Sequence, residues 1–169
     1  MSNRRRTLSF GGLHDVMPEV DRLLAGHRTA GRWSLGQICN HLGAGIVLSV
    51  DGFPGSAPWP IRATLGRFYK RKVLRSGVMP AGGKLPEKFT PRPGLDDRAE
   101  AEALRAAINA FSAHRGPVAP HPFYGPMTYD EWARLHSIHG AHHLSFTFPG
   151  TLPDPAPARL GEKIGSTLS

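Results

Sequence analysis

The sequence predicts an all-α fold: a bundle of four main helices, with a long connection and a short extra helix between helices two and three. Apolar residues recur at steps of three and four positions in four separate segments. Two of these segments open with the capping-box pattern Ser/Thr-x-x-Glu/Gln. No segment shows the alternation of apolar and polar residues that is typical of a strand. We therefore expect one helical domain over residues 1–150 and a Pro- and Gly-rich surface tail over 151–169.

The first two helices are expected over residues 13–25 and from Ser34 onward. Pro18 has to lie in the first turn of the first helix because proline disrupts a helix interior, and Gly26 suits its C-terminal cap. The second helix begins at the capping box formed by Ser34 and Gln37. The turn-forming residues 51–55 end it.

The connection between helices two and three is expected to hold the extra helix, which runs from Trp59 to about Ser76. Its spacing predicts a packed face made of Ile61, Leu65, Phe68, Val73 and Leu74. Its other face is basic and carries Arg62, Arg67, Lys70, Arg71, Lys72 and Arg75. Residues 79–94 then read as an extended loop that is long for a compact domain, so we expect it to cover a site or to contact a partner.

The third and fourth main helices are expected over residues 96–114 and from Thr128 onward. Acidic residues favour the start of the third helix, and its buried stripe is predicted to contain Leu104, Ala107, Ile108 and Phe111. A second capping box, formed by Thr128 and Glu131, opens the fourth helix, and residues 149–150 are expected to stop it. Its interior face is predicted to contain Trp132, Leu135, His136, His139, His142 or His143, and Phe146.

Histidines are the most informative residues of the chain. His139 and His143 are one helical turn apart and lie about 40° apart around the axis, so their imidazoles can share one metal ion. His41 lies on the apolar face of the second helix and could supply a third nitrogen from a facing helix. Three neutral imidazoles suit a divalent transition metal, with zinc or nickel as the expected ion and one position open for water or substrate.

Other polar residues near these histidines are expected to have structural roles. Five residues are candidates for groups that hydrogen-bond to the metal ligands or transfer protons: His136, His142, Gln37, Asn40 and His121. The glutamate that serves as general base in zinc proteases is missing after His139. Cys39, the only cysteine, excludes an intrachain disulfide and is expected to be a buried structural residue.

The excess of basic over acidic residues supports an alternative function, typical of another class of protein. The formal net charge is +8 and the pI is about 10.4, which favours contact with an acidic ligand or nucleic acid. In this alternative the histidines are merely packed, and the segment from Lys70 to Lys72 belongs to a non-catalytic module that binds nucleic acid or another polyanion.

Location and membrane contact are also constrained by the sequence. The single cysteine is compatible with a reducing cytoplasm, where we expect the protein to reside. The arginines near the N-terminus lack the apolar stretch of an export signal, so we interpret them as a solvated arm. The least polar stretch, residues 42–50, is too short to span a bilayer, and we expect no membrane partner.

Three groups of residues form a set that can be compared with known families: the segment Arg32 to Leu42 (RWSLGQICNHL), the segment His121 to Gly125 (HPFYG), and Glu131-Trp132 leading into His139 to Phe146 (HGAHHLSF). Together they resemble the DinB-like superfamily of metal-binding four-helix bundles, and more closely a bacterial DinB-like family of uncharacterised function. The resemblance spans about Arg5 to Phe148. It implies a divalent metal held by His41, His139 and His143.

The resemblance also implies classes of activity. Some members of the superfamily are S-transferases or isomerases that use a low-molecular-weight thiol, so we expect metal-dependent hydrolysis or thiol transfer to a small-molecule substrate. The doublet of His142 and His143 departs from the superfamily's pattern and leaves open which of the two faces the metal. Bundles of this type can also pair through helix faces, which makes a homodimer a further expectation.

Overall fold

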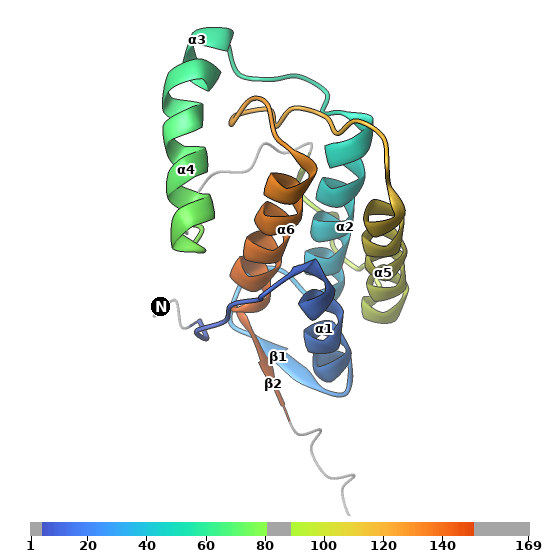
Figure 1. Ribbon diagram of the computed structural model, residues 1–169. Helices are drawn as coiled ribbons and strands as arrows, with labels where there is room; N and C mark the ends of the chain where they lie inside the picture. Colours follow the sequence, from blue (N-terminus) through green and yellow to red (C-terminus); the bar gives the residue numbers. More distant parts are fainter. Residues whose placement is uncertain (1–4, 81–88, 151–169) are drawn as a thin grey trace, which may run out of the picture.

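The computed structural model describes residues 5–80 and 89–150 of the chain, and the fold is mostly helical, as predicted (Figure 1). In chain order the elements are η1 (Leu13–Asp15), α1 (Val16–Leu24), β1 (His27–Thr29), α2 (Leu35–Asp51), α3 (Trp59–Ile61), the π-helical turn η2 (Arg62–Gly66), α4 (Arg67–Ser76), α5 (Asp97–Ala113), α6 (Tyr129–Leu144) and β2 (Thr147–Pro149).

Four helices, α1, α2, α5 and α6, surround the core. Helix α2 packs mainly against α5 and also against α6, while α1 contacts both α5 and α6. Leu23, Leu35, Leu104 and Leu144, one from each of these four helices, are fully buried where they meet. The stripe predicted for the third main helix is confirmed, because Leu104, Ala107, Ile108 and Phe111 are all buried.

Both predicted capping boxes form and fix where α2 and α6 begin. The Ser34 hydroxyl accepts a hydrogen bond from the backbone N–H of Gln37 at 3.1 Å, and the Gln37 side chain accepts one from the Ser34 N–H at 3.0 Å. Thr128 and Glu131 repeat the arrangement at 3.1 and 3.0 Å. Each box satisfies two backbone donors that a helix start otherwise leaves unpaired.

A short antiparallel ribbon corrects the expectation that the chain has no strand. Strand β1 pairs with β2 in the register His27 with Pro149 and Thr29 with Thr147. Each strand has three residues, which is too short to display an alternating pattern in the sequence. The ribbon also accounts for the end of α6 at Leu144, earlier than the expected stop at residues 149–150, because the chain then turns into β2.

The extra helix forms within the expected limits, but its predicted packed face is largely wrong. Val73 is buried, whereas Ile61, Leu65 and Phe68 are 39%, 54% and 63% exposed. The helix instead turns Gly66 towards Phe123, so closely that a side chain on Gly66 would overlap the Phe123 carbonyl oxygen. Helical spacing gives the width of an apolar face, but the neighbours that cover it decide whether it is buried.

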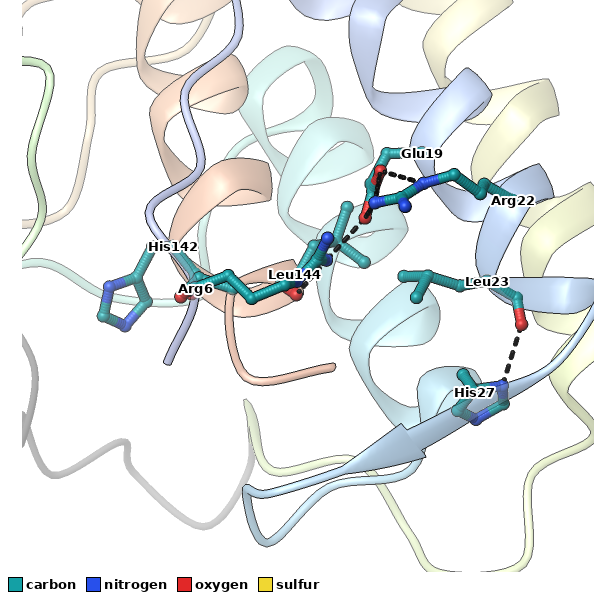
Figure 2. A network of polar contacts seen from close by, with 8 residues as sticks. Arg6, Glu19, Arg22, Leu23, His27, His142 and Leu144 are labelled. Carbon is teal, nitrogen blue, oxygen red and sulfur yellow. Dashed lines mark hydrogen bonds and ion pairs between the residues drawn. The ribbon is translucent and has the colours of Figure 1, made fainter. Parts of the chain in front are cut away.

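The N-terminal arm is more firmly attached than a solvated arm. The Arg6 side chain is only 16% exposed and its guanidinium forms an ion pair with Glu19 of α1 (Figure 2). The same guanidinium donates to the Leu144 carbonyl oxygen at 3.1 Å, and the backbone N–H of Arg6 donates to the Ser145 carbonyl oxygen at 2.8 Å. Arg22 forms a second ion pair with Glu19 at 2.8 Å.

Two expectations concern residues that the structure does not describe. The expected extended loop over residues 79–94 lies partly outside the described residues, because it contains residues 81–88. The expected tail over residues 151–169 lies wholly outside them. Within the described ranges, no helix combines the length and apolar character needed to cross a membrane.

Candidate metal centre

Two facing helices bring three histidines together. His41 lies in the second turn of α2, and His139 and His143 are one turn apart near the end of α6. The Nε2 atoms of His41 and His139 are 3.1 Å apart. One ring nitrogen from each of the three residues can be chosen so that all lie within 4.8 Å of one another. Among the described residues this is the one group of at least three histidine, cysteine or acidic side chains with such spacing.

The ring geometry shows which residue of the His142–His143 doublet clusters with His41 and His139. The His143 ring centroid lies 4.8 Å from that of His41 and 4.6 Å from that of His139, each at 71° between the ring planes. The structure thus places His143 in the cluster with His41 and His139. His142 is absent from the group of potential ligands and contacts the edge of the His143 ring instead.

The separation of the nitrogens fits a shared metal ion. Two imidazole nitrogens bound to one tetrahedral zinc, each at roughly 2.05 Å, lie about 3.3 Å apart. The Nε2 atoms of His41 and His139 already approach this separation. A nitrogen of His143 lies within 4.8 Å of one nitrogen of each of the other two rings. The three residues present therefore fit the donor set of a small transition-metal ion.

Electrostatics keep the three rings neutral, which is the form that binds metal. Burial is the main cause that lowers the pKa of all three imidazoles, to about 3 for His143 and well below the usual value for His139. The proximity of the other rings lowers the pKa of His139 and His143 further. A hydrogen bond with the backbone of Phe89 acts in the opposite direction on His41. Such a backbone contact orients a ligand histidine.

Trp33 forms one side of the cluster and was not predicted as a site residue. Its ring stacks on His143 with centroids 5.3 Å apart and an interplanar angle of 13°, and it lies 5.0 Å from the His41 ring. Trp33 immediately precedes Ser34, the N-cap of α2. Because Trp33 lies outside α2, helical spacing from His41 could not have identified it.

Two histidines that were candidates for hydrogen bonding to the metal ligands or for proton transfer support the fold. His136 is buried, and its Nε2 lies 3.0 Å from the Ser49 hydroxyl. This pair is no activated nucleophile, because Ser49 is fully buried and its hydroxyl donates to the Ile46 carbonyl oxygen. The His121 Nδ1 accepts hydrogen bonds from the backbone N–H groups of Phe123 and Tyr124 and thereby closes the turn before α6.

The polar side chains of α2 also serve the fold. Gln37 caps its own helix and donates to the Pro91 carbonyl oxygen at 3.1 Å, and Asn40 donates to the Glu100 carboxylate of α5 at 2.9 Å. Cys39 is fully buried, and burial raises the pKa of its thiol to about 12. The structural role expected for Cys39 is therefore consistent with an unreactive thiol.

His142 projects from α6 beside the N-terminal arm (Figure 2). It lines a cavity of about 230 Å³ between the N-terminal arm, the segment after α4 and α6. None of the three clustered histidines lines this cavity.

The fold and the cluster together define a mostly helical protein with a candidate three-histidine metal centre. A family model for a protein of unknown function, DUF1569, matches residues 2–150, and the chain belongs to this family. Comparisons with curated proteins and with solved structures gave no match.

Proposed function

We propose that this chain is a divalent-metal-binding protein of DinB-like type, with His41, His139 and His143 as ligands. The observation that carries the proposal is that one nitrogen from each ring lies within 4.8 Å of the other two. Zinc or nickel is the expected ion, because the donors are neutral nitrogens without a thiolate or carboxylate.

The arrangement of helices supports the DinB-like assignment. The helices α1, α2, α5 and α6 correspond to the four main helices of the bundle, and α3 and α4 lie in the connection between the second and third. The proposed ligands come from the second and the last of these helices. This is the distribution that the resemblance of the sequence to the superfamily implies.

The proposed activity is hydrolysis of a small molecule, or transfer of a low-molecular-weight thiol to an electrophilic one. A divalent ion held by three neutral imidazoles supplies Lewis acidity that lowers the pKa of a coordinated water or thiol. The residues of the chain hold and orient this centre: Phe89 orients His41, and Trp33 covers one face of His143. Trp33 also excludes water from that face and gives the substrate an apolar wall.

The first test is the metal content per chain, measured by elemental mass spectrometry on untagged protein purified without chelator. We expect close to one equivalent of a transition metal in the wild type and its loss in His41→Ala and His139→Ala. His142→Ala is the matched control, because it removes a neighbouring imidazole outside the cluster and should retain the metal. Stoichiometric metal in both ligand variants would exclude this site.

The two reaction classes are separated by a second assay on the metal-loaded protein. Hydrolysis of a p-nitrophenyl ester is compared with conjugation of chlorodinitrobenzene in the presence of a low-molecular-weight thiol. Thiol-dependent turnover that disappears in His143→Ala supports transfer, and ester hydrolysis without thiol supports the hydrolase. Activity that persists in metal-free His143→Ala would contradict both.

A further inference from the structure

Exposed apolar side chains gather on one surface of the protein. Among the described residues, the exposed large hydrophobic side chains outside Val47 all lie between Trp59 and Val78; they are Trp59, Ile61, Leu65, Phe68, Tyr69 and Val78. Trp59 and Phe68 are 72% and 63% exposed. Ile61, Leu65 and Phe68 follow at steps of four and three, so they form one stripe along α3, η2 and α4.

The same surface is strongly basic. No Asp or Glu occurs between Asp51 and Glu87. The exposed cations on α4 are Arg67, Arg71, Lys72 and Arg75, and none of them forms an ion pair with another residue that the structure describes. Lys70 points the other way and pairs with Glu131 of α6 at 2.8 Å. We call these four cations, together with Trp59 and the stripe, the α3–α4 face.

The helix is oriented so that the α3–α4 face points outward. Gly66 contacts the Phe123 backbone, Val73 is buried, and α4 packs against α6 at the edge of the molecule (Figure 1). These contacts occupy one side of the helix and leave the stripe and the adjoining cations on the other. Arg67, Arg71 and Arg75 recur at steps of four beside the stripe. An apolar stripe flanked by cations on one helix is typical of helices that lie in a membrane interface.

We propose that the α3–α4 face binds the surface of an anionic lipid bilayer, with α4 parallel to the membrane plane. The charge of the face is complementary to anionic headgroups, and its apolar stripe fits the boundary between headgroups and acyl chains. Trp59 at the end of the stripe is the residue type enriched at that boundary. The proposal concerns peripheral contact, which needs no membrane-spanning segment.

Two other occupants fit the face less well. Symmetric contact with a second copy would place the unpaired arginines of two α4 helices against each other, with like charges in close proximity. Nucleic acid would match the cations, but Ile61 and Leu65 neither stack on bases nor donate hydrogen bonds to phosphates. A lipid interface uses the aliphatic and the cationic side chains together.

The experiment is co-sedimentation of the full chain with sucrose-loaded vesicles. One set contains phosphatidylcholine alone, and in the other about a third of the lipid is phosphatidylglycerol, which gives a negative surface. We expect sedimentation with the anionic vesicles that weakens steeply as salt is added, and little with the neutral ones. A blue shift of tryptophan emission on binding, absent in Trp59→Phe, would place the end of the stripe in the interface.

Two double variants separate the contribution of the cations to vesicle binding from that of the apolar stripe. Arg71→Gln with Lys72→Gln should lower the affinity for anionic vesicles about fivefold for each residue. Leu65→Ser with Phe68→Ser should lower it about tenfold or more through lost apolar burial. The matched controls are Arg98→Gln and Val47→Ser, an exposed cation on α5 and an exposed apolar residue on α2, and both should bind like the wild type. Circular dichroism checks that each variant is folded.

Several outcomes would overturn the proposal. Equal sedimentation with both vesicle types, or an equal loss in the control variants, would exclude specific contact through this face. A wild-type dimer in light scattering that becomes monomeric in Leu65→Ser/Phe68→Ser would assign the face to a second copy. Oligonucleotide binding that depends on Arg71 and Lys72, without vesicle sedimentation, would assign it to nucleic acid.

Discussion

The Nε2 atoms of His41 and His139 lie 3.1 Å apart, although the two residues are separated by 98 positions in the chain. Only one nitrogen of such a pair can donate a proton to the other when both rings are neutral. A metal ion bound as proposed would replace this single contact by a bond to each ring. The pair therefore links α2 to α6.

Metal should stabilise the folded chain. Added Zn²⁺ is expected to raise the unfolding temperature of metal-free wild type, because binding to the folded state alone contributes about 2.7 kcal/mol at a hundredfold excess over Kd. His139→Ala should show no such rise, while His142→Ala should respond like the wild type. Differential scanning fluorimetry in the presence of zinc, and then of excess chelator, measures both effects. An equal shift in all three proteins would indicate binding elsewhere.

Gly66→Ala should destabilise the fold, because a methyl group there meets the Phe123 carbonyl oxygen. Overpacking of this kind costs about 1–3 kcal/mol. Gly45→Ala is the matched control: Gly45 is also helical, but a Cβ at this position has no neighbour within 4 Å. That change should stabilise α2 by about 0.5–1 kcal/mol. Urea unfolding of both variants measures the difference, and equal effects would contradict the close contact.

Stability should fall as the pH is lowered through the range in which unfolded histidines gain protons. Burial lowers the pKa of His121 to about 4 and that of His136 to about 3, from a usual 6.5. Between these values and 6.5 the unfolded chain binds more protons than the folded one. In that range each residue lowers the free energy of unfolding by about 1.4 kcal/mol for each pH unit of acidification, and this loss is absent above pH 6.5.

The measurement is the free energy of unfolding in urea at several pH values between 7 and about 4, with chelator present. His121→Asn keeps a hydrogen-bond acceptor for the turn but removes one titrating histidine. The free energy of unfolding of this variant should therefore depend less steeply on pH, by the contribution of one histidine. A variant with the wild-type slope would show that His121 does not remain neutral in the folded chain.

Cys39 should resist alkylation in the folded protein. Its thiol is fully buried and burial raises its pKa to about 12, so the reactive thiolate is scarce at neutral pH. Iodoacetamide treatment followed by intact-mass measurement should show no adduct under native conditions and one adduct in denaturant. Rapid native labelling would indicate that α2 opens next to His41.

The helices and the clustering of the three histidines were largely predictable because most of their signals are local. Ser34 with Gln37 and Thr128 with Glu131 define helix starts within four residues, and His139 and His143 are neighbours on any helix. The pairing of His41 with them needed the additional assumption that α2 faces α6. Periodicity supports this assumption, because it places His41 on the apolar side of its helix.

The remaining features depend on tertiary contacts that no short window contains. Strands β1 and β2 have three residues each and become strands only by pairing across the chain. Leu65 and Phe68 have the spacing of core residues, yet the close contact at Gly66 turns them outward. Trp33 lies outside the helix that carries His41, so only the fold shows that its ring covers His143.

The bond from the Arg6 N–H to the Ser145 carbonyl oxygen has a consequence for how the chain can be connected. It places the first and last parts of the helical domain side by side, as Figure 1 also shows for the arm and the end of α6. A circular permutant that joins these parts by a short linker, with new termini in the loop between α2 and α3, should therefore fold to the same bundle. In such a chain the segment with α3 and α4 would come first, and the three histidines would be encoded in a new order without any change in their positions in space.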